Sequence, residues 1–132
     1  MKMIFQYDKI SLSYNERFNK MDCLFCKIIN GQIPSSKVYE DDLCYAFLDI
    51  APQAKVHCLV IPKEHLASAN EINADNCSVI AHIFSVIPTI AASLNLGDGY
   101  RVVTNIGENG CQSVKHLHFH ILGGEKLSEK MA

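Results

Sequence analysis

The chain has 132 residues, of which 48% are hydrophobic and 20% are charged, and its formal net charge is −2 at pH 7. This length and composition predict one globular domain with a single hydrophobic core. The near-neutral charge, without blocks of like charge, argues against a nucleic-acid polymer or an anionic membrane surface as a partner. Every apolar run is too short to span a bilayer, so no transmembrane helix is expected.

Residues 1–21 differ from the rest of the chain. They lack clear hydrophobic periodicity, and they contain neither a continuous apolar h-region nor a small-residue cleavage site, so they do not resemble a signal peptide. We expect a mobile extension, or a translation start assigned too far upstream, followed by a domain at residues 22–132. Four of the six cysteines stand singly among apolar neighbours, which favours reduced thiols and a cytoplasmic protein.

Two segments have the pattern of helices. Asp22 is placed to cap a short helix at residues 23–30, and Gly31 is placed to end it in a left-handed conformation. Residues 73–96 carry apolar side chains at helical spacing and predict a long amphipathic helix. Pro88 lies inside this second stretch and should kink or break it.

Five further segments have the composition or alternation of β-strands, and the first two flank Asp41 and Asp42 as a hairpin. The predicted strands are residues 37–40, 43–50, 56–62, 100–105 and 114–122. Together with the helices, they predict an α+β fold with a mainly antiparallel five-stranded sheet, a short N-terminal helix and one long helix.

Three of the six histidines, His116, His118 and His120, stand at every second position of the run HLHFHILGG. On a strand they would share one face, and the apolar residues between them would cover the other. The spacing alone leaves three uses open: a zinc site, covalent catalysis by one imidazole, or a polar stripe on a sheet surface. His82, within the long helix, has no evident partner and is expected to face solvent.

Cys23 and Cys26 form a C-x-x-C pair in the first turn of the short helix. In a reduced chain such a pair indicates a redox site, half of a zinc site, or two free thiols. The βαβ context of a thioredoxin-like redox pair is missing from the predicted order, which argues against a redox site and leaves zinc and free thiols open. A zinc ion would need two further ligands from elsewhere in the chain.

The histidine run resembles the signature of the histidine-triad (HIT) family, in which three histidines alternate with apolar residues and two apolar residues follow. The similarity extends back through YRVVTNIGENGCQSVKHLHFH, LDIAPQAKVHCLVIPKEH and CLFCKIINGQIPSSKVYEDD, and so covers residues 22–126. Gln112-Ser113 and the ILGG ending are most similar to the Hint-like, nucleotide-binding branch. The resemblance implies a HIT-like fold.

The resemblance also implies a hydrolase of nucleotide conjugates. His118 would attack the α-phosphorus and form a nucleotidyl-histidine intermediate, which water would then hydrolyse. His120 and His57 would lie close to the phosphate. Ser113 would contact the phosphate and help to pass a proton to the leaving group.

A nucleotide site follows from the same resemblance. Asn105, Gln112 and the glycine loop between them would offer N–H donors to the phosphate, and Asp49 would accept hydrogen bonds from the ribose hydroxyls. Ile50 belongs to the same site. A purine is implied, because the larger ring buries more apolar area. The apolar residues that match the base-enclosing positions are Leu24, Phe25, Ile28, Ile33, Phe47 and Leu59.

Some HIT proteins with the same C-x-x-C pair carry a structural zinc ion. The matching positions here imply Cys2His2 ligation by Cys23, Cys26, His65 and His116. A closed set of four ligands leaves no position for substrate, so the zinc would be structural. The three histidines of the run would then have three different roles.

The favoured function is hydrolysis of purine nucleoside 5′-phosphoramidates, such as adenosine phosphoramidate, or of aminoacyl-adenylates. The alternatives are a dinucleoside polyphosphate hydrolase, a nucleotide-binding interaction module with little turnover, and a zinc hydrolase that uses the histidine face directly. The resemblance implies a homodimer, with the long helix and a sheet edge at the interface. In relatives a C-terminal tail from the partner, often with a tryptophan, reaches the substrate; this chain has no tryptophan and ends in GEKLSEKMA.

Overall fold

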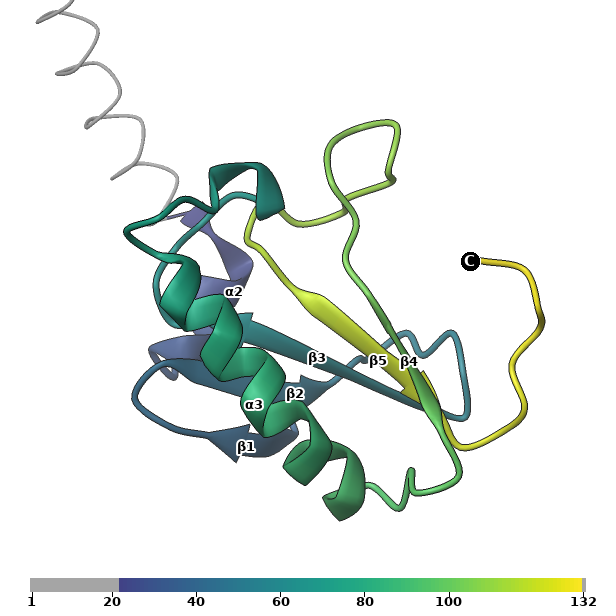
Figure 1. Cartoon of the computed structure of the whole chain (residues 1–132). Helices are drawn as coiled ribbons and strands as arrows, with labels where there is room; N and C mark the ends of the chain where they lie inside the picture. Colours follow the sequence, from purple (N-terminus) through teal and green to yellow (C-terminus); the bar gives the residue numbers. More distant parts are fainter. Residues whose placement is uncertain (1–21, 132) are drawn as a thin grey trace, which may run out of the picture.

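The computed structural model describes residues 22–131. In that part of the chain, a single sheet carries the long helix α3 (Cys77–Ser93) on one face and the short helix α2 (Leu24–Ile29) on the other (Figure 1). None of the helices described there is long and apolar enough to cross a membrane. The extension predicted at residues 1–21 lies outside the described residues.

The sheet has five strands in the order β1-β2-β3-β5-β4, and every neighbouring pair is antiparallel. The predicted α+β fold is therefore confirmed. A short 3-10 turn, η1 (Ala69–Glu71), was not predicted. The strands are β1 (Lys37–Glu40), β2 (Cys44–Leu48), β3 (Val56–Pro62), β4 (Tyr100–Val103) and β5 (Phe119–Gly123).

Alternate residues of the central strands face opposite sides of the sheet and form two cores. Ala46, Cys58 and Val60 pack with α3, whereas Phe47 and Leu59 pack with α2. Full burial of a side chain such as Leu59 is worth roughly 1.5–3 kcal/mol. Burial on both faces therefore holds the sheet between the two helices.

α3 runs without a break through Pro88, so the predicted break is wrong. Pro88 lies on the exposed side of the helix, where water can hydrate the carbonyl that loses its donor. The opposite side carries the predicted apolar stripe, and Ile83, Ile87 and Ile90 are buried against the sheet.

α2 begins one residue later than predicted. Its N-cap is Cys23 rather than Asp22: the Cys23 backbone is extended, and its Sγ accepts a hydrogen bond from the Cys26 N–H at 3.4 Å. Gly31 follows the helix with a φ of 76°, the left-handed conformation that the sequence predicts. The first turn of α2 thus brings the two cysteine side chains together.

β5 also begins later than predicted, at Phe119 rather than at residue 114. His116 and His118 precede the strand because their carbonyl oxygens accept hydrogen bonds from side chains instead of from a neighbouring strand. The alternation still holds, since Leu117 and Phe119 belong to the core under α3. His120 is the one member of the histidine run that lies within β5.

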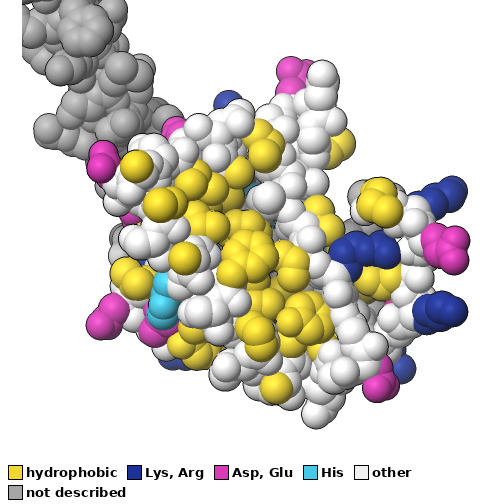
Figure 2. All heavy atoms as spheres, in the orientation of Figure 1, with side chains coloured by type: hydrophobic (Ala, Val, Ile, Leu, Met, Phe, Trp, Pro, Cys, Tyr) yellow, Lys and Arg dark blue, Asp and Glu magenta, His cyan; other side chains and the backbone are white. Residues whose placement is uncertain are grey.

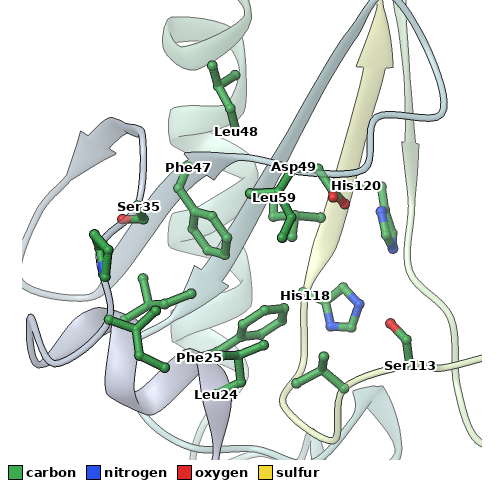
Figure 3. Close-up of a pocket in the computed structure, with 15 residues that line it drawn as sticks. Leu24, Phe25, Ser35, Phe47, Leu48, Asp49, Leu59, Ser113, His118 and His120 are labelled. Carbon is green, nitrogen blue, oxygen red and sulfur yellow. The ribbon is translucent and has the colours of Figure 1, made fainter.

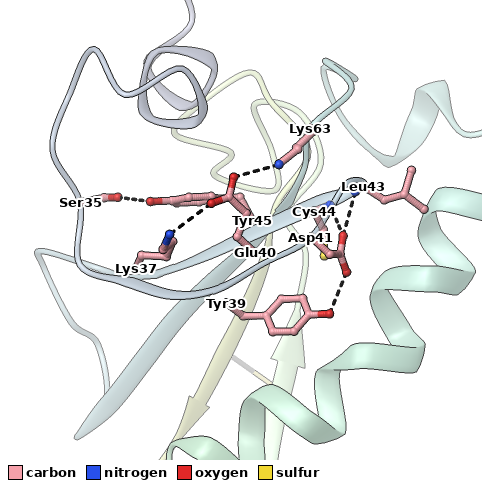
Figure 4. Close-up of polar contacts among 9 residues, drawn as sticks. All are labelled: Ser35, Lys37, Tyr39, Glu40, Asp41, Leu43, Cys44, Tyr45 and Lys63. Carbon is pink, nitrogen blue, oxygen red and sulfur yellow. Dashed lines mark hydrogen bonds and ion pairs between the residues drawn. The ribbon is translucent and has the colours of Figure 1, made fainter.

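Asp41 ties the turn between β1 and β2 to α3. One carboxylate oxygen accepts the backbone N–H groups of Leu43 and Cys44, and the other accepts the Tyr39 hydroxyl at 2.8 Å (Figure 4). His82 Nε2 lies 2.6 Å from this second oxygen, so the expectation that His82 faces solvent without a partner is wrong. Burial alone would raise the pKa of Asp41, but the hydrogen bonds, that from His82 foremost, hold it well below its usual range.

Asp41→Asn should lower the stability at pH 7 by about 1–2 kcal/mol, because an amide cannot accept hydrogen bonds at both of its ends. The pKa of Asp41 is lower in the folded than in the unfolded chain. Its contribution is therefore complete above the unfolded pKa of about 4 and is lost as the pH falls below that value. The Tm values of wild type and variant, measured by circular dichroism, should converge at acidic pH. Asp42→Asn is the matched exposed control, and a Tm gap that is the same at every pH would contradict this account.

Candidate active site

His57 and His120 meet on the face of the sheet that carries α2. The antiparallel register sets His120 opposite Leu59 of β3 and opposite Val103 of β4, so these side chains share one face. His57 Nε2 lies 2.8 Å from His120 Nδ1. The ring of His118 lies on the same side, with its centroid 5.0 Å from that of His120.

The tautomer of His118 is set by the backbone. Its Nδ1 lies 2.6 Å from the His116 carbonyl oxygen, which can only accept, so Nδ1 carries the proton and Nε2 has a free lone pair. His118 is 2% exposed, and burial lowers its pKa. The ring is therefore neutral at pH 7 and has the form that a nitrogen nucleophile requires.

The proton positions of His57 and His120 follow by the same reasoning. The Gln53 backbone N–H donates to His57 Nδ1 at 3.0 Å, so His57 carries its proton on Nε2. This Nε2–H group donates a hydrogen bond to His120 Nδ1. Burial lowers the pKa of His120 to about 4. The neutral ring then has its proton on Nε2.

His120 Nε2 is buried, and it has no hydrogen-bond partner among residues 22–131. A buried N–H donor without an acceptor costs about 1–3 kcal/mol, and native structures keep such groups rarely. His120 is one of the residues that line the pocket described next. The site therefore presents one N–H donor that a bound acceptor, such as a phosphate oxygen, would satisfy.

An apolar pocket of about 230 Å³ lies between α2, β2 and the histidines His118 and His120 (Figure 3). All six residues predicted to enclose a base line it: Leu24, Phe25, Ile28, Ile33, Phe47 and Leu59. Pro34, Ser35, Leu48 and Val114 line it as well and were missed by the sequence analysis. For Pro34 and Ser35 the sequence does contain a signal, because they form a predicted turn next to the short helix.

Asp49, Ile50 and Ser113 also line this pocket, as predicted. Asp49 Oδ1 accepts the Ala51 N–H at 2.8 Å, and Oδ2 lies 3.5 Å from His57 Nε2. The carboxylate is thus held in place while 20% of the side chain stays exposed. A held, ionised carboxylate can accept two hydrogen bonds from neighbouring hydroxyls of a ligand.

Gln112 and Asn105 lie outside the apolar pocket. The Gln112 side chain braces its own loop: Oε1 accepts the Gly107 N–H at 3.0 Å, and Nε2 donates to the carbonyls of Ala67 and Val114. Asn105 lines a second cavity together with His57 and His120. Gln112 therefore shapes the loop that presents Ser113.

The cysteine pair of α2 meets two histidines. One ligand atom from each of Cys23, Cys26, His65 and His116 lies within 4.8 Å of all the others. Cys23 Sγ lies 3.4 Å from His116 Nδ1, and Cys26 Sγ lies 3.3 Å from His65 Nδ1. Tetrahedral ligation with ordinary zinc bond lengths would separate sulfur and nitrogen by about 3.5 Å. The four residues are therefore close enough to hold a metal ion.

The tautomer of His116 suits a metal ligand. Its Nε2 lies 2.9 Å from the Pro62 carbonyl oxygen, which fixes the proton on Nε2 and turns the lone pair of Nδ1 toward the two sulfurs. Burial lowers the pKa of His116 to about 4, so the ring is neutral, as ligation requires. His116 and His118 thus use opposite nitrogens for different purposes.

The fold and the alternating histidines define a histidine-triad protein, and comparison with known proteins agrees. The model of the HIT domain family matches residues 30–127. An uncharacterized HIT-like protein from Synechococcus elongatus is 50% identical over 107 residues, which cover 81% of this chain and 94% of that protein. The chain belongs to the HIT family.

Solved structures show the same likeness. A histidine triad protein from Clostridium difficile is 50% identical, with a TM-score of 0.80, over 83% of this chain and 96% of that chain. A HIT family hydrolase from Clostridium thermocellum is 43% identical, with a TM-score of 0.81 and the same coverage. The HIT-like fold that the sequence motifs predict is confirmed.

Gly110→Ala should destabilise the loop before Ser113. A Cβ at Gly110 would lie 2.5 Å from the Ile106 carbonyl oxygen, so the backbone would have to shift. We expect a loss of roughly 1–3 kcal/mol in the free energy of unfolding, measured with urea. Gly97→Ala is the matched control, because a Cβ there meets no atom within 4 Å. Equal effects of the two substitutions would show that the close contact is unimportant.

Proposed function

We propose that this protein hydrolyses purine nucleoside 5′-phosphoramidates, such as adenosine phosphoramidate, or aminoacyl-adenylates, through a nucleotidyl-histidine on His118. The observation that carries the proposal is a buried, neutral His118 whose Nδ1 is held by a backbone carbonyl and which lines an apolar pocket. The similar structure from Clostridium thermocellum is named a HIT family hydrolase, which supports hydrolysis as the reaction.

In the first step His118 Nε2 attacks the α-phosphorus and the bond to the leaving group breaks. The departing amine takes the proton of the Ser113 hydroxyl, which lines the pocket, and Ser113 recovers a proton from the attacking water in the second step. The positive charge that develops on the His118 ring is stabilised by the His116 carbonyl at Nδ1. Water then attacks the phosphorus, the N–P bond breaks with its electron pair returning to Nε2, and the nucleotide leaves.

The other polar groups serve binding and charge. His120 Nε2–H donates to a phosphate oxygen, which satisfies its missing hydrogen bond in the ligand-bound state. Asp49 accepts the ribose hydroxyls. The base lies between α2 and the sheet, in contact with side chains such as Phe25 and Phe47, and a purine is favoured by the apolar area that it buries.

We propose zinc as the metal at Cys23, Cys26, His65 and His116, since two thiolates and two imidazoles in a tetrahedral set suit it. Bound there, zinc would supply folding free energy by joining α2 to the segments after β3 and before β5. A closed set of four ligands leaves the reaction to His118. Reduced thiols of this kind fit the cytoplasm.

We also propose that the protein is a homodimer. Apolar side chains gather over the face of α3 (Figure 2). Phe84 of α3 is 50% exposed even though its ring packs edge-on against Phe119. β4 is an edge strand, and Tyr100 in it is 37% exposed. An exposed apolar helix face and an open sheet edge both favour a two-fold interface.

His118→Ala should lower kcat/KM for a fluorogenic adenosine phosphoramidate by at least about 10³-fold, because it removes the nucleophile. Binding of AMP, measured by calorimetry, should change only a few-fold and serves as the folding control. Turnover near the wild-type rate would refute the assignment. Parallel assays on a diadenosine polyphosphate test the alternative hydrolase, and tight AMP binding by a wild type that turns over neither substrate would indicate a binding module instead.

Cys23→Ser should abolish bound zinc, measured by elemental analysis, and should lower Tm. Near-normal kcat/KM is expected at temperatures where the variant stays folded, because the metal acts through stability. Cys77→Ser is the matched control, since the Cys77 thiol is exposed at the start of α3. A chelator that stops turnover without changing Tm or the circular dichroism spectrum would instead indicate a catalytic zinc.

A further inference from the structure

A second cavity, of about 480 Å³, lies on the far side of His120 from the apolar pocket. The sheet register explains the arrangement, because Leu59, His120 and Val103 form one row across β3, β5 and β4. Leu59 lines the apolar pocket, Val103 lines the second cavity, and His120 lines both. His57 lines the second cavity and His118 lines the apolar pocket, so the two spaces meet at His120.

The chain's own C-terminal segment forms one wall of this cavity. After β5 the chain turns back and runs beside β4 (Figure 1), and residues 125–128 line the space. The Arg101 guanidinium of β4 donates to the Ser128 carbonyl oxygen at 2.7 Å and holds the segment there. Gln53 and Ala54, from the loop before β3, line the cavity as well.

The charges in this cavity favour an anion. Arg101 and Lys126 contribute two positive charges, against one negative charge from Glu125. The Arg101 guanidinium has five N–H donors, and within residues 22–131 the bond to Ser128 is the one hydrogen bond that this side chain makes. Its side chain is partly buried on the sheet face, where a guanidinium binds a carboxylate or phosphate more strongly than it does in open water.

We propose that this cavity is the leaving-group subsite and that it selects leaving groups with an anionic group, recognised by Arg101 and Lys126. The inference rests on the proposed function. A substrate whose base fills the apolar pocket and whose phosphate meets His120 continues into this cavity. The anion is either the carboxylate of an amino-acid amine or a phosphate of a second nucleotide, and Arg101 and Lys126 are specificity-determining residues for both.

The test uses two adenosine phosphoramidates that differ in one group: the amine is glycine, with a carboxylate, or glycinamide, its neutral counterpart. The wild type should favour the glycine compound by about tenfold in kcat/KM, and the preference should shrink as ionic strength rises. Arg101→Gln and Lys126→Gln should each remove most of this preference, and Lys126→Gln should slow the glycine compound far more than the glycinamide compound. Lys130→Gln, in the same segment but outside the cavity lining, should behave as wild type.

A parallel arm with diadenosine tetraphosphate separates the two sources of the anion. Loss of the glycine preference in the variants identifies a carboxylate, and loss of tetraphosphate turnover identifies a phosphate. The inference is overturned if the variants change neither, or if both phosphoramidates slow equally in Lys126→Gln, which keeps the bond between Arg101 and Ser128. If the wild type turns over neither phosphoramidate, the proposed function fails, and the ratio of their affinities, measured by calorimetry, still tests the subsite.

Discussion

The hydrogen bond from His118 Nδ1 to the His116 carbonyl, 2.6 Å long, determines what the rest of the site can do. It orients the ring, fixes the tautomer and keeps the lone pair on Nε2. The bond is possible because residues 116–118 lie outside the hydrogen-bonded ladder of the sheet, since β5 begins only at Phe119. In a strand that began at residue 114, this carbonyl would be available to a neighbouring strand, and Nδ1 would lose its acceptor. The late start of β5 is thus a condition for the chemistry that we propose.

α2 connects the metal cluster to the apolar pocket. Phe25 lies between Cys23 and Cys26 in sequence, and its ring packs edge-on against both His116 and His118, with centroids 5.9 and 5.2 Å apart. A metal ion at the cysteines would therefore fix the helix that supports the nucleophile. Six residues are too few for an independently stable helix, so α2 depends on such contacts.

The sequence predicted best where a local period governs the structure. Period-2 alternation correctly placed Leu117 and Phe119 on the face opposite the histidines, which is the face that α3 covers, even though the predicted start of the strand was wrong. The contact between His82 and Asp41 joins residues 41 positions apart, and no local pattern marks it. Likewise, three of the four missed pocket residues, Pro34, Ser35 and Val114, lie on loops whose paths depend on tertiary packing. The tautomers could not be predicted, because that of His120 depends on the His57 ring and the others each depend on one backbone group.

The charges along the proposed substrate path explain why a substrate would bind in one direction. The Asp49 carboxylate lies at the nucleoside end, neutral imidazoles occupy the middle, and Arg101 and Lys126 lie at the other end. A reversed substrate would bring its anionic group against the Asp49 carboxylate, which would repel it. Its hydroxyls would then face Arg101 and Lys126, which would lose their anionic partner. Neutral histidines let the middle of the path hold a phosphate through hydrogen bonds, and an anion there would raise the low pKa values that burial gives His57 and His120. The site can therefore gain positive charge when the phosphate arrives, without the cost of burying it beforehand.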